Sequence, residues 1–370
     1  MKVLKGKYNY AKVMADIIDE TTEKQIVSML DHPAFKDSKI VIQADCHAGA
    51  GAVIGFTSTL NDYIIPNIVG VDIGCGMLMG LFRVDDVDLH GLDNFIKNNI
   101  PSGFSVNDIA YNVDNPFYTE IESICSTIGI PSQRVFQSIG TLGGGNHFIE
   151  AGWTESGLLA VTIHSGSRNF GLKIANYYQS IAKANCDSYF FERKDLEFLL
   201  TNSIDGRAYL YATRVAQQYA SLNRVVMLEK ISSFLKSPIV DTIETVHNYI
   251  GDDNIIRKGA VSARAREKVI LPFNMADGLA ICVGKGNPEY NYSAPHGAGR
   301  IMGRMEAKRS LDMGAFTERM RGVYTTTATE DTLDEAPMAY KPMESIISCI
   351  GDTLEIKEFV KPIYNFKAIG

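Results

Sequence analysis

A carboxylate and a thiol lie three positions apart in Val69-Gly70-Val71-Asp72-Ile73-Gly74-Cys75-Gly76-Met77, and a glycine stands on each side of the cysteine. The glycines allow a tight turn that brings Asp72 and Cys75 toward one point. A thiolate can bridge two cations, and a nearby carboxylate can complete a coordination shell. The stretch predicts a metal-binding turn. The competing interpretation is a strand that enters a glycine turn with a buried, unreactive cysteine.

Three of the seven histidines, His47, His164 and His247, follow apolar runs typical of strands. Strand ends that lead into glycine-rich loops are where α/β folds place reactive side chains. With Asp72 and Cys75, three histidines would suffice for two adjacent metal sites of low coordination number. Imidazole and thiolate ligands favour Zn, Mn, Fe or Co over Mg or Ca. A single histidine in such a place is more often structural, so the prediction depends on the recurrence of the pattern.

Two further segments have residue types suited to phosphate chemistry. In Gly143-Gly144-Gly145-Asn146-His147-Phe148-Ile149-Glu150, glycines can bring backbone N–H groups against phosphate oxygens, although no P-loop Gly-Lys-Ser/Thr is present. The alternative is a flexible turn. In Ser293-Ala294-Pro295-His296-Gly297-Ala298-Gly299-Arg300, an exposed imidazole could act as a base, a metal ligand or a covalent nucleophile. The residues leave these three roles of His296 open.

Basic residues form two groups on a chain whose formal net charge is -7. A negative chain has no overall field that attracts nucleic acid, so such contacts must come from local patches. We therefore interpret the two groups as a local phosphate-binding surface, and favour a solvated helix face for Lys308 and Arg309. The first group is Arg257, Lys258, Arg264, Arg266 and Lys268, and the second is Arg300, Arg304, Lys308 and Arg309.

The elements that must position these residues are a mixture of strands and helices. The apolar patterns predict strands at 40–42, 64–71, 78–84 and 158–163, another before His247, and strands in the tail at 354–366. They predict helices at 88–98 and 116–128, and a long helix at 206–235 that ends before Pro238. No repeat or linker separates the elements, which favours one interwoven α/β or α+β domain over two.

Composition limits the class of protein. The chain has 370 residues, enough for a sizeable core, and it has neither an apolar signal-peptide run nor a segment long enough to span a bilayer. The six cysteines show no CxxC and no disulfide-like spacing, which suits a reducing cytoplasm. We therefore expect a cytoplasmic protein without a membrane partner.

Together, these segments resemble the RtcB family of RNA-splicing ligases, and the resemblance spans nearly the whole chain. The matching motifs occur in one order. They are Asp45-Cys46-His47-Ala48-Gly49, Val71-Asp72-Ile73-Gly74-Cys75-Gly76-Met77, Gly143-Gly144-Gly145-Asn146-His147-Phe148-Ile149-Glu150, His164-Ser165-Gly166-Ser167-Arg168, His247-Asn248, Arg257-Lys258-Gly259-Ala260, Gly284-Lys285-Gly286-Asn287, His296-Gly297-Ala298-Gly299-Arg300 and Asp334-Glu335-Ala336-Pro337.

The resemblance implies a single α+β domain over residues 1–370, with mixed sheets around a metal-containing cleft. It implies a ligase that uses GTP and two Mn²⁺ ions to join RNA ending in a 2′,3′-cyclic phosphate or 3′-phosphate to RNA beginning with a 5′-hydroxyl. The substrates would be broken RNAs, in repair or in tRNA splicing. The resemblance names no oligomeric state and leaves an activating protein partner open.

The family's site residues carry over onto this sequence one by one. The implied metal ligands are Asp72, Cys75, His147, His164 and His247, with Cys75 bridging. The histidine that carries GMP is His296. The implied nucleotide contacts are Asn146, Glu150, Gly297, Ala298, Gly299, Tyr340 and Lys367. One departure is Leu271-Pro272-Phe273-Asn274-Met275-Ala276-Asp277-Gly278, where many members have a Pro-Gly-Ser-Met-Gly-like loop.

Two other functions compete with RNA ligation. A binuclear metal phosphoesterase would use the same ligands to activate water and would need no covalent histidine. An RNA-binding paralogue without catalytic activity is the third interpretation. The presence of every implied ligand and of His296 argues against it.

Overall fold

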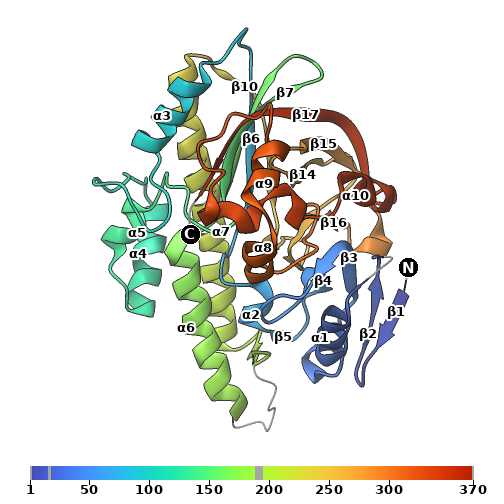
Figure 1. Ribbon diagram of the computed structural model, residues 1–370. Helices are drawn as coiled ribbons and strands as arrows, with labels where there is room; N and C mark the ends of the chain where they lie inside the picture. Colours follow the sequence, from blue (N-terminus) through green and yellow to red (C-terminus); the bar gives the residue numbers. More distant parts are fainter. Residues whose placement is uncertain (1, 16–17, 188–194, 369–370) are drawn as a thin grey trace.

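Strands and helices alternate irregularly along the chain, of which the computed structural model describes residues 2–15, 18–187 and 195–368 (Figure 1). The predicted α+β class, with several sheets around a cleft that contains groups able to bind metal, is confirmed. The interpretation that residues 1–370 form one undivided domain stays a prediction. Within the described ranges, no helix is both long and apolar enough to cross a bilayer.

The larger sheet positions most of the candidate ligands. Its seven antiparallel strands lie in the order β10 (Ile239–Val246), β6 (Gly76–Phe82), β8 (Leu159–Ser165), β7 (Phe148–Thr154), β17 (Leu354–Lys367), β15 (Gly278–Gly284) and β14 (Lys268–Asn274). Strand β8 is buried on both faces, which explains its continuous apolar sequence. Val161 and Ile163 share a core with helices on one side, and Ala160 joins a separate core on the other.

The second sheet has six strands, in the order β1 (Lys2–Lys5), β2 (Tyr10–Val13), β3 (Ile40–His47), β4 (Ile54–Thr59), β12 (Ile255–Lys258) and β11 (Asn248–Ile250). Two short pairs complete the strands. They are β13 (Ala260–Ser262) with β16 (Ser293–Pro295), and β5 (Tyr63–Ile64) with β9 (Leu199–Leu200). Because β16 ends one residue before His296 and β3 contains Asp45, this part of the fold brings the two residues together.

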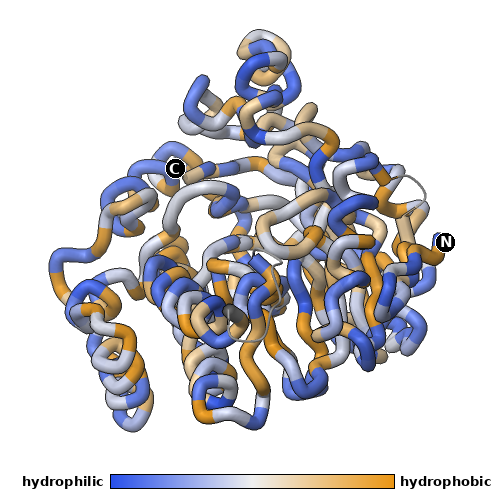
Figure 2. Tube along the Cα trace, turned by 90° about the horizontal axis from the view of Figure 1, so that it is seen from below, coloured by the Kyte–Doolittle hydropathy of each residue, from blue (hydrophilic) through white to orange (hydrophobic). Residues whose placement is uncertain are grey.

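Ten α-helices occur within the described ranges, and α6 and α7 run side by side in Figure 1. The helices are α1 (Glu20–Leu30), α2 (Pro66–Val69), α3 (Leu89–Asn99), α4 (Phe117–Ile128), α5 (Ser132–Gln137), α6 (Arg168–Asp187), α7 (Ile204–Leu235), α8 (Arg304–Ser310), α9 (Met313–Arg319) and α10 (Met343–Cys349). Four 3₁₀ helices are η1 (Pro33–Phe35), η2 (Pro288–Tyr290), η3 (Glu330–Glu335) and η4 (Pro337–Ala339). Figure 2 shows hydrophobic and hydrophilic stretches alternating along the helices, as expected for helices with one buried face.

The predicted helices at 88–98, 116–128 and 206–235 are confirmed as α3, α4 and α7, and the tail forms the single long strand β17. The predicted strand at 64–71 is wrong. Strand β5 ends at Ile64, and Pro66 begins the short helix α2. Proline is favoured in the first helical turn because its fixed φ suits a helix and its missing N–H is not needed there. Gly70 and Gly74, with φ of 91° and 75°, then form the turn that contains Asp72.

Candidate active site

Five candidate metal ligands converge at one end of the seven-stranded sheet. Asp72 and Cys75 lie in the turn before β6, His147 directly precedes β7, His164 lies in β8, and His247 directly follows β10. His164 pairs with Met77 on β6 and with Phe148 on β7, and Val246 pairs with Gly76. Antiparallel pairing therefore places the start of β6 and β7 beside the end of β8 and β10, which gathers the five side chains.

The ligand atoms form two groups of three that share the Cys75 thiol: Asp72, Cys75 and His147, and Cys75, His164 and His247. Cys75 Sγ lies 3.5 Å from His147 Nε2 and 3.4 Å from His164 Nε2. His147 Nε2 lies 3.0 Å from an Asp72 oxygen, and His164 Nε2 lies 3.3 Å from His247 Nε2. Ligands at about 2.0–2.3 Å from one tetrahedral ion lie roughly 3.3–3.8 Å apart, so three of these four distances fit metal coordination, and the distance between His147 and Asp72 is shorter.

The strand-end pattern selected one histidine wrongly. His47 lies at the end of β3 and belongs to neither three-residue group, whereas His147, which precedes its strand, belongs to one of them. The ring of His47 lines the cavity, and its Nδ1 is 3.1 Å from the Asp45 carbonyl oxygen. In an antiparallel sheet, the end of one strand lies beside the beginning of its neighbour. His147 precedes β7 and therefore lies beside the end of β8.

Protonation in this cluster also suits a metal site. Burial lowers the pKa of His164 and His247 well below the ordinary value, so both rings are neutral and can offer a lone pair. His164 Nδ1 donates to the Asn146 carbonyl oxygen at 3.2 Å, which leaves Nε2 free as a ligand. Burial and the Asp72 charge raise the pKa of Cys75, and a bound cation would reverse this by stabilising the thiolate.

Two buried polar residues of α7 position the loops that contain the ligands. Arg224 donates to the carbonyl oxygens of Gly74 and Ser165, at 2.9 and 2.7 Å, next to Cys75 and His164 in sequence. Asn223 accepts from the backbone N–H of Thr141 and donates to the Gly166 carbonyl oxygen. Sequence reasoning missed both residues. A polar Asn-Arg pair within an otherwise apolar helical face was the available signal.

His296 is oriented by a buried carboxylate that the sequence did not single out. Its Nδ1 lies 2.7 Å from an Asp45 oxygen, and its backbone N–H donates to the same oxygen at 3.1 Å. Asp45 is fully buried, whereas the side chain of His296 is 20% exposed. With Nδ1 donating to Asp45, Nε2 carries the lone pair and is available for attack. The ring lies 4.9 Å from that of His247, so the nucleophile candidate adjoins the metal-binding groups.

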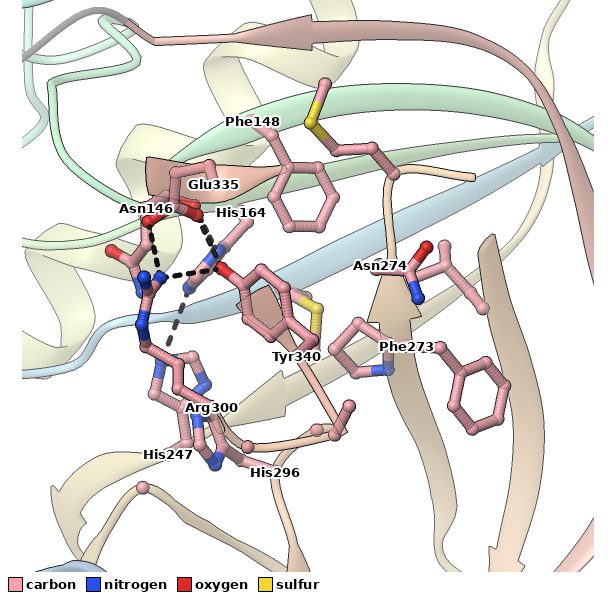
Figure 3. A pocket seen from close by; sticks show the side chains of 18 of the residues that line it. Asn146, Phe148, His164, His247, Phe273, Asn274, His296, Arg300, Glu335 and Tyr340 are labelled. Carbon is pink, nitrogen blue, oxygen red and sulfur yellow. Dashed lines mark hydrogen bonds and ion pairs between the residues drawn. The ribbon is translucent and has the colours of Figure 1, made fainter. Parts of the chain in front are cut away.

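One cavity of about 330 Å³ joins these parts. It is lined by Asp72, Cys75, His164 and His247, and by every residue that the resemblance proposed for the nucleotide: Asn146, Glu150, His296, Gly297, Ala298, Gly299, Tyr340 and Lys367. Figure 3 shows Tyr340 and Arg300 between Glu335 on one side and the His247 and His296 rings on the other. The structure therefore brings these residues together, while their roles toward a nucleotide stay a prediction.

A buried carboxylate links the aromatic and basic side chains of this cavity. We call the set Glu335, Tyr340, Lys367, Arg300 and Arg304 the Glu335 cluster. Glu335 accepts from the Tyr340 hydroxyl and from Lys367 Nζ, both at 2.6 Å, and pairs with Arg300 at 3.3 Å and Arg304 at 2.6 Å. Burial opposes its ionisation, but the charges of Lys367 and Arg304 lower the pKa of Glu335 to about 2. Sequence reasoning assigned Glu335 no role.

We expect Glu335→Gln to lower the free energy of unfolding by about 3–5 kcal/mol at pH 7, because removing one partner leaves buried cations uncompensated. The folded-state pKa is below the ordinary 4.5, so the stabilisation is present above pH 4.5 and is lost as pH falls toward 2. Urea unfolding at pH 7 measures the loss. Glu344→Gln, which changes an exposed carboxylate on α10, is the matched control and should have little effect. Equal stability of the two variants would contradict this role.

Glu150 is the second buried carboxylate of the cavity. Its Oε2 accepts from Asn365 at 2.9 Å, and its Oε1 has no hydrogen-bond partner among the described residues. Burial raises its pKa to about 8, against the opposing effects of Asn365 and Lys367. An unsatisfied carboxylate oxygen in a cavity wall is suited to receive an N–H donor from a ligand.

The first basic group divides between the interior and the surface. Arg257 is 1% exposed, pairs with Asp253 at 2.8 Å and donates to Ser293, so its guanidinium is used inside the fold. Lys258 is also buried, donates to the carbonyl oxygens of Ala50 and Asn67, and has a pKa lowered to about 8 by burial. The surface interpretation is wrong for these two, because their charges satisfy buried oxygens.

Arg264 and Arg266 are exposed, as a phosphate-binding surface requires. Arg264 also pairs with Asp253 at 2.8 Å. Their contact with RNA stays a prediction.

The second basic group divides between the cavity and the surface. Arg300 and Arg304 line the cavity within the Glu335 cluster, and Lys308 lies 3.5 Å from Asp334. Arg309 is exposed.

The divergent segment 271–278 comprises the end of β14, the turn at 275–277 and the first residue of β15. Asn274 Oδ1 accepts from the backbone N–H groups of Ala276 and Asp277, both at 3.0 Å, and its amide donates to the Asp277 carboxylate. Asn274 thus stabilises the turn, while Phe273 is buried. Both residues line the cavity (Figure 3), so the altered segment contributes to its wall.

The chain is similar to known proteins over most of its length. The family described as "tRNA-splicing ligase RtcB" matches residues 25–127 and 122–368. The RNA-splicing ligase RtcB of Escherichia coli (strain K12) is 30% identical over 380 residues, which cover 92% of each chain. The tRNA-splicing ligases RtcB of Nanoarchaeum equitans and Aeropyrum pernix are 24% and 26% identical, over 83% of this chain and 83% and 82% of their own.

Proposed function

Because this chain belongs to the RtcB family of RNA ligases, we propose that it joins RNA ends that carry a 2′,3′-cyclic phosphate or 3′-phosphate to RNA ends that carry a 5′-hydroxyl, with GTP as the second substrate. The observation that supports this most is the position of His296. His296 lines the cavity beside two three-residue groups that could hold metal, and its Nδ1 is held by Asp45. Broken RNA, in repair or in tRNA splicing, is the proposed substrate class.

In the first step, His296 Nε2 attacks the α-phosphorus of GTP. A P–N bond forms, the bond from the α-phosphorus to the bridging oxygen breaks, and pyrophosphate leaves with the electron pair. Nδ1–H stays hydrogen-bonded to Asp45, whose negative charge stabilises the positive charge that develops on the ring. GMP then passes from His296 to the RNA 3′-phosphate, which makes GMP the leaving group when the 5′-hydroxyl attacks.

The residues that would hold two Mn²⁺ ions are Asp72, Cys75 and His147 for one, and Cys75, His164 and His247 for the other. Bound divalent cations would neutralise phosphate charge and lower the pKa of a coordinated hydroxyl. Three protein ligands per group leave coordination positions for substrate oxygens. The shared thiol holds the two groups next to each other, and Asn146 fixes the ring of His164.

In this proposal, guanine is recognised by Glu150, Tyr340 and Lys367, which line the cavity. Glu150 Oε1, which lacks a protein partner among the described residues, is suited to accept from the N–H groups of the guanine edge. Tyr340 and Lys367 offer an aromatic face and a donor, and Glu335 holds both. Gly297 and Gly299 flank Ala298 beside His296 and leave space for a phosphate.

The free cysteine thiols indicate the cellular location that we propose. Cys46, Cys75, Cys125 and Cys282 are free thiols, and a thiolate that serves as a metal ligand requires reducing conditions. We therefore propose a cytoplasmic enzyme. An activating protein partner remains compatible with this proposal.

The test is intact-protein mass spectrometry after incubation with GTP and Mn²⁺, followed by a gel assay with the four combinations of RNA ends. We expect one added GMP per chain, and joining of 3′-phosphate or 2′,3′-cyclic phosphate ends to 5′-hydroxyl ends alone. Joining of 3′-hydroxyl to 5′-phosphate ends would contradict the end chemistry. RNA cleavage or phosphate release without an adduct would favour the metal phosphoesterase, since the same five ligand residues could hold ions that activate water.

A further inference from the structure

A surface loop beside the metal-binding groups is fixed along its whole length. The segment 101–113 connects α3 to α4 and appears as the teal loop at the left edge of Figure 1. Gly103 N–H donates to the Gly143 carbonyl oxygen at 2.8 Å, and the Asn107 side chain donates to the carbonyl oxygens of Gln137 and Ile139 at 3.0 and 2.7 Å. Gly143 in turn approaches His147 so closely that an added Cβ would lie 2.7 Å from Nδ1. The loop therefore adjoins a metal ligand.

This anchored loop presents two large apolar side chains to solvent. Phe104 is 90% exposed and Ile109 is 84% exposed, the two highest values among large hydrophobic residues of the described chain. An exposed phenyl ring gains nothing from folding, yet the backbone on both sides of it is fixed by hydrogen bonds. Such a rigid, exposed aromatic ring is suited to stacking on a flat ligand.

Three basic side chains donate hydrogen bonds to the loop. Arg134 Nη2 donates to the Phe104 carbonyl oxygen at 3.0 Å, and Arg168 Nη2 donates to the Gly103 carbonyl oxygen at 2.7 Å. Lys230 Nζ lies 3.3 Å from Asn107 Oδ1. None of these three cations forms an ion pair with a carboxylate in the part of the chain that the structure describes. Segment 101–113 has one acidic residue, Asp108, and no basic residue, so its positive charge comes from these neighbours, of which Arg134 is exposed.

From this arrangement we propose that segment 101–113 is a platform for single-stranded RNA, in which Phe104 stacks on a nucleobase while the exposed Arg134 attracts a flanking phosphate. Sequence-tolerant RNA binding commonly pairs an aromatic stacking face with a positively charged track. Because Gly143 adjoins His147, the platform lies beside one of the two groups proposed to hold metal, close to where the phosphate end of the RNA would be activated. The inference rests on the proposed function and adds the surface that holds the RNA strand.

The test is fluorescence anisotropy with a labelled single-stranded RNA that ends in a 3′-phosphate, in Mn²⁺ without GTP. Phe104→Ala should raise the Kd about tenfold, and Phe104→Trp should retain the wild-type value, because stacking requires an aromatic face. Tyr10→Ala is the matched control, since Tyr10 is an exposed aromatic residue on β2 and should leave the Kd unchanged. Thermal unfolding should be the same for all variants, because neither ring is buried.

The experiment distinguishes failure of the RNA-platform proposal from failure of the proposed ligase function. GMP attachment needs no RNA, so Phe104→Ala should form the adduct as the wild type does. If the wild type binds RNA in a Phe104-dependent manner but never ligates, the proposed function fails and the platform stands. If Phe104→Ala binds RNA as tightly as the wild type, or the wild type binds no RNA, the platform is overturned. A Phe104→Ala defect confined to binding of another protein would equally overturn it.

Discussion

His296→Ala incubated with GTP and Mn²⁺ is expected to carry no nucleotide, whereas the wild-type chain gains one GMP. The reason is the proposed role of His296 Nε2 as the nucleophile, on a ring whose Nδ1 is held by Asp45. Mass spectrometry of the intact protein measures the adduct, and a histidine phosphoramidate should survive base and break in acid. The variant should keep most of its bound metal, since His296 belongs to neither ligand group.

Two further variants sharpen this prediction. Asp45→Asn should slow adduct formation by about 10²–10⁴-fold without abolishing it, because an amide favours the wrong imidazole tautomer and cannot balance the ring's positive charge. His90→Ala changes an exposed histidine on α3 and should form the adduct at the wild-type rate. GMP found on another residue, or loss of metal from His296→Ala without loss of the adduct, would show that His296 is not the nucleophile.

Replacement of the shared thiol should have the largest effect on metal content. Cys75→Ala removes a ligand from both groups at once, so we expect loss of both ions and a fall in ligation of more than about 100-fold. Cys75→Ser should retain the shape of the site and still bind Mn²⁺ poorly. His147→Ala and His247→Ala each affect one group, and each should remove mainly one ion. Elemental analysis after dialysis gives the metal content per chain.

Cys282→Ala is the control for this series, because Cys282 is also a buried thiol but lies in the core that contains β15. It should lose stability through its small cavity and keep its metal content. Two ions per chain in Cys75→Ala, together with continued ligation, would disprove the bridging role of Cys75.

Local sequence patterns were sufficient for much of this protein. The glycines around Asp72 and Cys75 predicted the turn, and the apolar patterns predicted the helices α3, α4 and α7 and the strands β3, β6, β8, β10 and β17, because these depend on interactions between residues close in sequence. The short run before the turn was ambiguous, since a few buried apolar residues fit a strand or a helix equally well. Pro66 in the first turn and the packing of α2 favour the helix over a strand.

The tertiary structure decided which of the chemically capable residues share one site. His147, and not His47, lies in a group of residues that could hold a metal ion, because antiparallel pairing places the beginning of β7 beside the end of β8. The sequence does not distinguish Arg257 and Lys258 from Arg264 and Arg266, but in the structure the first two side chains are buried. The contacts of Asp45 with His296 and of Glu335 with Lys367 join residues far apart in the chain. No local pattern contains such a contact, because it exists only once the two sheets have brought their strands together.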